Sequence, residues 1–328
     1  MTPPAPAPPA RRVLLLGATG TIGRATAREL VTRGHYVVCP VRRSARTLPE
    51  LDGAQLHVAE AASAGAIARD AIRADGFDVL ISCLASRTGV PADAWAIDHA
   101  AHVEALAAAQ AAGIGRMIQL SAICVQTPRL AFQHAKLAFE AALMQSGLDW
   151  TIVRPTAFFK SLSGQVERVR RGKPFMVFGD GRLTACKPIS DRDLATFLAD
   201  CIDAPARINR VLPIGGPGPA ITPRDQGEML FELTGQPARF THVPVRMLDA
   251  AIAALDAGGR VSTRLAAKAE LARIGRYYAT ESMLVRDEAT GAYDADATPA
   301  FGNDRLRDHY ARLIAGEVDA ALGDHAVF

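Results

Sequence analysis

The sequence has few cysteines and little net charge. Its 328 residues include five cysteines, an odd number, and none of them forms a C-x-x-C pair. Neither a disulfide framework nor a zinc site is therefore expected. The 37 basic and 34 acidic residues leave a net charge of +3, which is not the basic footprint of a nucleic-acid-binding protein. We expect reduced thiols, no metal bound by the protein itself and no nucleic-acid partner.

Long hydrophobic runs are also missing. No stretch of 18 apolar residues is free of charge, so no membrane-spanning helix is expected. Residues 1–10 form a Pro/Ala tract without the charged start of a signal peptide, and we expect a disordered tail there. These features favour a cytoplasmic protein and leave open a peripheral association with a membrane. The oligomeric state does not follow from the sequence.

From residue 11 onward, short apolar runs alternate with helical patterns. The expected strands cover 13–16, 36–41, 56–59, 79–84, 117–120 and 151–153, and the expected helices cover 25–32, 66–74, 94–112 and 131–146. Such alternation predicts an α/β fold with a doubly wound parallel sheet of the Rossmann type. The apolar continuity of the strands fits burial on both faces.

This regular alternation ends after Arg154-Pro155. A hairpin with a turn at Asp180-Gly181 is expected over 177–182, and helices are expected to begin after Ser190 and at Thr222-Pro223. We expect a smaller, irregular C-terminal substrate domain formed by 158–185 and 216–328. Residues 11–157 would form the sheet domain, and residues 186–215 would return to it.

A glycine-rich turn joins the first expected strand to the first expected helix, with the spacing G-x-x-G-x-x-G. In this context Gly17 permits a tight turn, Gly20 lets backbone N–H groups approach a pyrophosphate, and Gly23 allows close helix–strand packing. The turn predicts a dinucleotide site, and a purely structural turn is the alternative. The expected contacts are Gly17, Thr19, Gly20, Thr21, Ile22 and Gly23.

The end of the second expected strand bears on the choice between NAD and NADP. Arg42 and Arg43 stand there, and the next acidic residue after the start of the strand is Glu50. An acid would bind the ribose 2′-hydroxyl, whereas arginine pairs with a 2′-phosphate. We therefore expect NADPH, with a solvated arginine pair as the alternative.

The glycine signature and the strand-then-helix segment over 117–139 resemble the short-chain dehydrogenase/reductase superfamily, in its atypical NAD(P)-binding branch. Members carry a Tyr-x-x-x-Lys pair, whose tyrosine donates a proton and whose lysine holds the nicotinamide ribose. The matching residues here are Phe132 and Lys136, one helical turn apart on the same face. The resemblance implies that Lys136 is a cofactor-binding and catalytic residue. The missing phenol argues against ordinary carbonyl–alcohol chemistry.

Other strand ends supply further candidates, because ligands bind at the carboxyl ends of strands in doubly wound sheets. Ser121 follows the fifth expected strand and either donates a hydrogen bond or caps the strand. Pro155 and Thr156 resemble the loop that flanks the nicotinamide in the same superfamily, or Pro155 only ends the strand. Ser121 and Thr156 are thus candidate catalytic residues. The further cofactor contacts expected are Cys83, Leu84, Ala85, Pro155 and Thr156.

A closer resemblance rests on longer strings. Residues 82–89, 120–126, 154–165 and 275–283 are similar to the NADPH-dependent family of divinyl chlorophyllide a 8-vinyl-reductases of plants and proteobacteria, and the similarity runs from residue 13 to residue 310. The N-terminal residues show no Ser-rich transit peptide, so the resemblance implies a phototrophic bacterium as the source.

This family implies hydride transfer from NADPH to the 8-vinyl group of a magnesium tetrapyrrole, divinyl chlorophyllide a or divinyl protochlorophyllide a, in (bacterio)chlorophyll biosynthesis. The vinyl group becomes ethyl. Negative charge would spread over the macrocycle, so no strong acid is needed at a carbonyl oxygen. The proton would come from water or from Ser121, Thr156 or Lys136.

A flat tetrapyrrole needs a broad apolar slot with a few polar anchors. Phe158, Phe159 and Tyr277 are candidate walls, although an aromatic residue at any one of these positions is more often part of the core than a ligand contact. Lys160 is a candidate partner of the pigment's propionate, and a solvated lysine is the equal alternative. The candidate axial ligands of the pigment's magnesium are His99, His102, His134 and Cys124.

Three other functions stay open from the sequence. They are an isoflavone-reductase-like enzyme for another conjugated substrate, an NADPH-binding redox sensor, and a scaffold subunit that keeps the cofactor. All of them predict dinucleotide binding, so cofactor binding alone does not discriminate among them.

Overall fold

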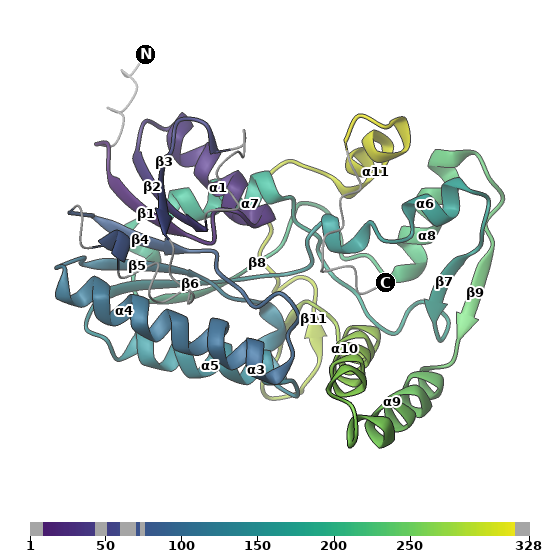
Figure 1. Cartoon of the computed structure of the whole chain (residues 1–328). Coiled ribbons are helices and arrows are strands. Elements are labelled where there is room, and N and C mark those ends of the chain that lie inside the picture. The colour runs from purple at the N-terminus through teal and green to yellow at the C-terminus, as the bar shows by residue number, and fades with distance from the viewer. Residues whose placement is uncertain (1–8, 43–50, 60–69, 73–75, 319–328) are drawn as a thin grey trace, which may run out of the picture.

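The computed structural model describes residues 9–42, 51–59, 70–72 and 76–318. Its main sheet has seven parallel strands in the order β3-β2-β1-β4-β5-β6-β8 (Figure 1). The strands are β1 (Arg12–Leu16), β2 (Tyr36–Arg42), β3 (Gln55–Ala59), β4 (Val79–Ser82), β5 (Arg116–Leu120), β6 (Asp149–Pro155) and β8 (Arg210–Ile214). The doubly wound parallel sheet expected from the sequence is confirmed. The expected tail and the helix expected over 66–74 lie wholly or mostly outside the described residues.

Helices cover both faces of the sheet, as the alternation of side chains along β1 illustrates. Val13 and Leu15 pack with residues of α1 (Thr21–Thr32) and α7 (Asp191–Asp200). Leu14 and Leu16 pack on the opposite face with α4 (His102–Ala111) and α5 (Ala131–Met144). Successive side chains of a strand point to opposite faces, so a strand that is apolar at every position is buried on both.

The strand order reverses between β1 and β4. From β1 the chain moves outward through β2 and β3, and then crosses back to β4, β5, β6 and β8. Adjacent strand ends diverge at such a switch point and leave room for a ligand. The carboxyl ends of the strands lie on the side that faces α6 (Val166–Arg170), α8 (Pro223–Thr234) and α10 (Thr263–Thr280) (Figure 1).

Two helices begin where the sequence predicts, after Ser190 and at Thr222-Pro223. The Ser190 hydroxyl accepts a hydrogen bond from the Asp193 N–H at 2.9 Å and caps α7. Thr222 and Asp225 form a capping box at the start of α8. The segment that carries α7 then continues into β8, which pairs with β6 at the edge of the main sheet.

The C-terminal part contains smaller sheets and the remaining helices, α9 (Val245–Gly259) and α11 (Leu306–Ala315). β7 (Phe175–Phe178) pairs in parallel with β9 (Phe240–Val243), and β10 (Val285–Arg286) pairs with β11 (Tyr293–Asp294). The hairpin expected over 177–182 is therefore wrong. The turn at Asp180-Gly181 forms, but β7 buries Phe175 and Val177 in the cluster that includes α8, and its partner strand comes from beyond that helix.

The helix expected over 94–112 is divided into three segments. It runs as α3 (Pro91–Ala94), a π-helical turn η3 (Trp95–Ala101) and α4. A π-turn widens the helix locally and is frequent at functional sites. Here it places the carboxylate of Asp98 inside the protein, where the side chain is fully buried.

A buried histidine ties this helix to β4. The His102 Nδ1 atom lies 2.8 Å from the Ile97 carbonyl oxygen, and Nε2 lies 2.8 Å from the Ser82 hydroxyl. Since a carbonyl can only accept, Nδ1 carries the proton and Nε2 accepts from Ser82. Burial and the nearby charge of Lys136 lower the pKa of His102 to about 4, so the ring stays neutral at physiological pH.

We expect this histidine to make the protein acid-sensitive. The unfolded chain takes up a proton on His102 below about pH 6.5, its ordinary value, whereas the folded chain does so only near pH 4. The free energy of unfolding should therefore fall by about 3 kcal/mol between these pH values. Denaturant titrations at pH 7, 6, 5 and 4 should show that His102→Gln is less acid-sensitive than wild type, whereas His242→Gln, at an exposed position, keeps the wild-type slope. Parallel curves for His102→Gln and wild type would contradict the assignment.

Candidate functional site

The glycine turn after β1 lies against the end of β4. Gly17 has a φ of +75°, and a Cβ atom there would lie 2.6 Å from the carbonyl carbon of Cys83 and from the amide nitrogen of Leu84. A Cβ on Gly23 would lie 2.1 Å from the carbonyl oxygen of Gly17. Side chains at these two positions would separate β1, α1 and β4, so the glycines fix the switch point of the sheet.

The N-terminus of α1 is open. Gly20 is the N-cap and offers no side chain to the first N–H groups of the helix, while Thr19 and Gly20 are exposed. Unpaired N–H groups and the helix dipole favour an anion at this point. Ile22 is buried in the core below the turn, so only its backbone could face a ligand.

The other cofactor residues expected near the turn fall into two groups. Cys83, Leu84 and Ala85 directly follow β4 and flank the glycine turn, with Ala85 exposed. Arg42 ends β2, but its side chain and the whole of Arg43 lie outside the described residues. Their expected contact with a 2′-phosphate therefore stays a prediction.

Lys136 lies at the same edge of the sheet and is paired. Its Nζ atom is 2.9 Å from Oδ1 of Asp98, which also accepts a hydrogen bond from the Ser86 N–H at 3.3 Å. Oδ2 of Asp98 is buried and has no hydrogen-bond partner among the described residues. Sequence reasoning missed Asp98, although an acid within an Ala-rich apolar helix was a usable signal. The pair holds an ammonium group beside an unsatisfied acceptor at the strand ends.

The hydroxyl of Ser121 is engaged by a second buried carboxylate. Ser121 donates to Glu140, which also accepts from the guanidinium of Arg154. Glu140 is one turn beyond Lys136 on α5, and sequence reasoning missed it too. Thr156 likewise donates its hydroxyl proton to the carbonyl oxygen of Lys187. Both candidate hydroxyls therefore already have acceptors within the protein, and Thr156 directly follows Pro155, the last residue of β6.

The phenylalanine at the expected tyrosine position packs against the C-terminal part. Phe132 shares an apolar cluster with Tyr277 of α10. The Tyr277 hydroxyl donates to the Cys124 carbonyl oxygen at 2.8 Å and lies 2.7 Å from the Thr127 hydroxyl. Burial raises the pKa of Tyr277 to about 12. The neutral Tyr277 hydroxyl therefore connects α10 to the segment after β5 by hydrogen bonds. Its side chain is buried and is not an exposed wall of a substrate site.

The remaining substrate candidates separate in space. Phe159 is 5% exposed and lies in the C-terminal core beside His309, so it is not an open wall. Phe158 is half-buried and packs on the main core. Lys160 reaches the glycine turn, where its Nζ atom donates to the Thr21 hydroxyl at 3.0 Å. The structure thus places Lys160 with the expected cofactor residues.

The expected axial ligands are also dispersed. His102 has both ring nitrogens engaged, and Cys124 is buried, where burial raises the pKa of its thiol. Both are therefore unsuited to bind a pigment's magnesium. His134 is exposed on α5, and His99 packs against Trp95. In the described part of the chain, no group of three or more His, Cys, Asp or Glu residues could hold a metal ion.

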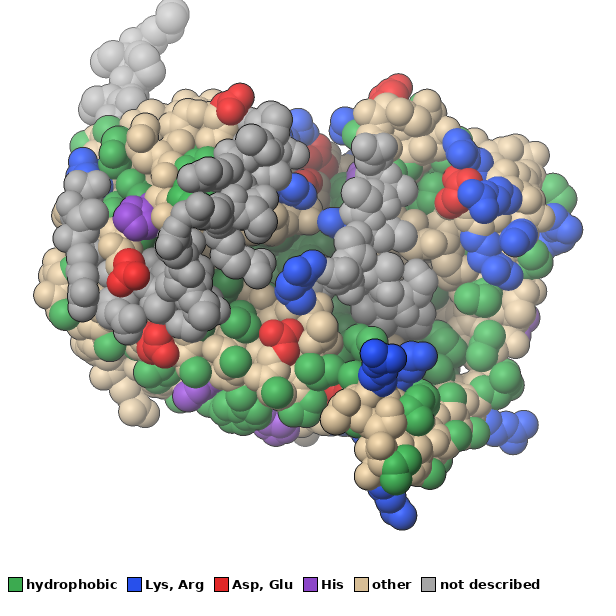
Figure 2. Space-filling model, viewed as in Figure 1, with side chains coloured by type: hydrophobic (Ala, Val, Ile, Leu, Met, Phe, Trp, Pro, Cys, Tyr) green, Lys and Arg blue, Asp and Glu red, His purple; other side chains and the backbone are tan. Residues whose placement is uncertain are grey.

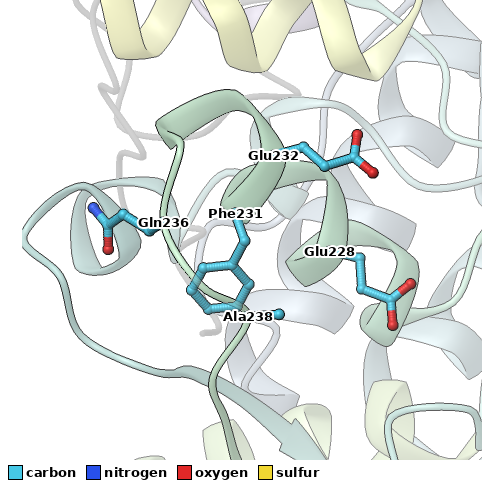
Figure 3. A pocket seen from close by; sticks show the side chains of 5 residues that line it. All are labelled: Glu228, Phe231, Glu232, Gln236 and Ala238. Atoms are coloured by element: carbon cyan, nitrogen blue, oxygen red, sulfur yellow. The ribbon is translucent and has the colours of Figure 1, made fainter.

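The surface contains a hollow between the part with the main sheet and the part with α6, α8 and α9, with basic side chains along it and hydrophobic ones at its floor (Figure 2). A separate shallow pocket lies on α8 and the turn after it (Figure 3). Its lining residues are Glu228, Phe231, Glu232, Gln236 and Ala238. The two carboxylates make it unfavourable for an anionic ligand.

None of the helices in the described ranges is long and apolar enough to cross a membrane.

Comparisons with known proteins identify the family of this chain. Residues 17–205 match the NAD(P)H-binding protein family, and the match begins at the first glycine of the turn. The chain is 46% identical to the chloroplastic divinyl chlorophyllide a 8-vinyl-reductase of Oryza sativa subsp. indica, over 98% of this chain and 83% of that protein. It is 44% identical to the Arabidopsis thaliana enzyme of the same name, over 95% of this chain and 79% of that protein.

A solved structure supports the fold. MoeE5, in complex with UDP-glucose and NAD, superposes with a TM-score of 0.66 and 18% identity, over 93% of this chain and 97% of that chain. At this level of identity the likeness is one of fold alone. Sequence similarity to the reductases and structural similarity to an NAD-bound protein both extend over most of the chain.

We expect Gly23→Ala to disrupt the turn. The added Cβ would collide with the Gly17 backbone, and overpacking of this kind typically destabilises a protein by about 1–3 kcal/mol. Thermal denaturation should show a lower Tm, and NADPH titration should show a loss of affinity. Gly115→Ala is the matched control, because a Cβ there meets nothing within 4 Å. Equal effects of the two substitutions would disprove the close approach.

Proposed function

The chain belongs to the divinyl chlorophyllide a 8-vinyl-reductase family of NAD(P)H-binding proteins, and we propose that it uses NADPH to reduce the 8-vinyl group of divinyl chlorophyllide a, or of divinyl protochlorophyllide a, to an ethyl group. The observation that carries this proposal is the 44–46% identity to two named reductases over 95–98% of this chain. The identity covers the C-terminal part as well as the cofactor-binding part, and the C-terminal part is where substrate specificity is expected to differ within a shared fold.

The residues at the strand ends fit NADPH. The cradle at Gly17, which a Cβ would fill, and the open N-terminus of α1 would hold the pyrophosphate. Lys136 would hold the nicotinamide ribose, and Arg42 with Arg43 would bind the 2′-phosphate. When bound, NADPH would supply the hydride for the terminal vinyl carbon, and a proton would complete the ethyl group.

We assign the proton to Lys136, or to water that Lys136 orients. The Asp98 carboxylate accepts a hydrogen bond from Nζ at 2.9 Å and so fixes the position of the lysine side chain at the strand ends. Ser121 and Thr156 remain candidate donors, but each already donates its hydroxyl proton within the protein. Lys136 is therefore a better candidate for the proton donor than either hydroxyl.

Phe132 is consistent with C=C reduction. A carbonyl reductase needs an acid at the developing alkoxide, whereas the charge formed by addition to a conjugated vinyl group is spread over the macrocycle. The ring at this position is packed with Tyr277 and offers no proton donor.

We propose that the pigment lies between the sheet part and the C-terminal part, with Phe158 and the segments 158–185 and 216–328 on its substrate side. The division between a cofactor domain at 11–157 plus 186–215 and this substrate part follows the same proposal.

We also propose a cytoplasmic location in a phototrophic bacterium, with peripheral contact to the photosynthetic membrane where the pigment is delivered.

The first expected outcome is a spectral one. Anaerobic incubation with NADPH and divinyl chlorophyllide a should shift the Soret band to shorter wavelength as the 8-vinyl group leaves conjugation. NADH should support little or no shift, because Arg42 and Arg43 favour a 2′-phosphate. Tight NADPH binding without any shift would instead favour a redox sensor or a scaffold subunit.

The second outcome concerns the ion pair. Lys136→Met should lower kcat/KM by about 100-fold or more, since it removes both a ribose contact and a charged donor. Asp98→Asn should retain part of the activity, because the ammonium group survives without its carboxylate. Lys268→Met, at an exposed position on α10, is the control. Unchanged steady-state kinetics for Lys136→Met would show that Lys136 neither binds the ribose nor delivers the proton.

A further inference from the structure

The side chain of Lys160 crosses from the segment after β6 to the first residue of α1. Its Nζ atom donates to the Thr21 hydroxyl at 3.0 Å, between residues 139 positions apart in the sequence. The backbone beside it is fixed, because the Phe159 N–H donates to the Ile189 carbonyl oxygen at 3.2 Å and the Phe159 ring is buried. The ammonium group is therefore delivered to the glycine turn by a well-anchored segment.

The positive charge of Lys160 has no negatively charged hydrogen-bond partner among the described residues near Thr21. Lys160 makes no ion pair within the described ranges, and its hydrogen bond goes to a neutral hydroxyl. Burial and the charge of Arg24 lower the pKa of Lys160, and Asp191 offsets only part of this effect. The N-terminus of α1 adds a further partial positive charge. The Lys160 ammonium group and the N-terminus of α1 thus meet at Thr21, which favours an anion there.

We propose that Lys160 binds the pyrophosphate of the dinucleotide, together with the glycine turn, and does not bind the propionate of the pigment. The ammonium group would exchange the neutral Thr21 hydroxyl for a phosphate oxygen when the cofactor enters. This inference deepens the proposed function and rests on it for the identity of the cofactor.

A consequence is that the cofactor fixes the segment that begins the substrate side. The residues between Thr156 and Lys160 include Phe158, and their backbone is bound to Ile189 on one side. A phosphate contact at Lys160 would anchor the other end. The pyrophosphate and the pigment-facing wall are therefore linked through a single short stretch of chain.

The test compares Lys160→Met with wild type in direct binding titrations of NADPH and NADH, without pigment. A charged hydrogen bond to phosphate predicts an increase in Kd of about 10- to 100-fold. The factor should be the same for both dinucleotides, because they share the pyrophosphate. Lys160→Arg should recover most of the affinity, and Lys173→Met, at an exposed position, should leave it unchanged. Lys160→Gln serves as the second neutral variant if Lys160→Met does not fold.

The other outcomes are distinct. A loss for NADPH but not for NADH would mean that Lys160 binds the 2′-phosphate, and this would overturn the proposal. An unchanged Kd with a raised KM for divinyl chlorophyllide a would restore the propionate contact and also overturn it. Because binding is measured without pigment, a chain that reduces no chlorophyllide but loses dinucleotide affinity on Lys160→Met would refute the proposed function and leave this inference standing.

Discussion

The close approach of the β1–α1 turn to the end of β4 is the constraint on which the other features of the site depend. Two glycines allow backbone to meet backbone there, at Gly17 against Cys83 and at Gly23 against Gly17. The sheet reverses its strand order at the same point. An open helix N-terminus, a lysine from beyond β6 and the residues after β4 all converge on this turn because the chain is packed so tightly beneath it.

Two buried ion pairs surround that convergence. Lys136 with Asp98, and Arg154 with Glu140, bring charges from α5, η3 and β6 to the strand ends. Burying a charge pair is rarely a gain in stability, because desolvation offsets the attraction. Their retention at the carboxyl edge of a parallel sheet is better explained by positioning. One pair holds an ammonium group, and the other engages the hydroxyl of Ser121.

The sequence was sufficient for the elements that depend on local pattern. The apolar runs located six of the seven parallel strands, and the glycine spacing located the turn, because both signals are contained in a few neighbouring residues. The edge strand β8 was not among the expected strands. The acid at Asp98 was visible in the pattern, but its pairing with Lys136, like that of Glu140 with Ser121, could not be found this way, because the packing of helices brings these side chains together. The β7–β9 pairing was missed for the same reason, and the Asp-Gly turn at 180–181 wrongly suggested a local partner. The contact of Lys160 with Thr21 is likewise not predictable from local pattern, because it joins residues 139 positions apart in the sequence.

Because of the π-turn in the helix before β5, the orientation of Asp98 and Ile97 depends on the number of residues in that helix as well as on their identity. In a regular α-helix each residue advances the direction of the side chains by about 100°. Loss of one residue within η3 would let the helix continue in regular form, but every side chain before the change would rotate relative to α4. Asp98 and Ile97 could then no longer face Lys136 and His102 together. A conservative point substitution on this helix is thus a smaller change to the site than a one-residue deletion, so alignments of relatives should show this helix free of length variation even where its surface composition drifts.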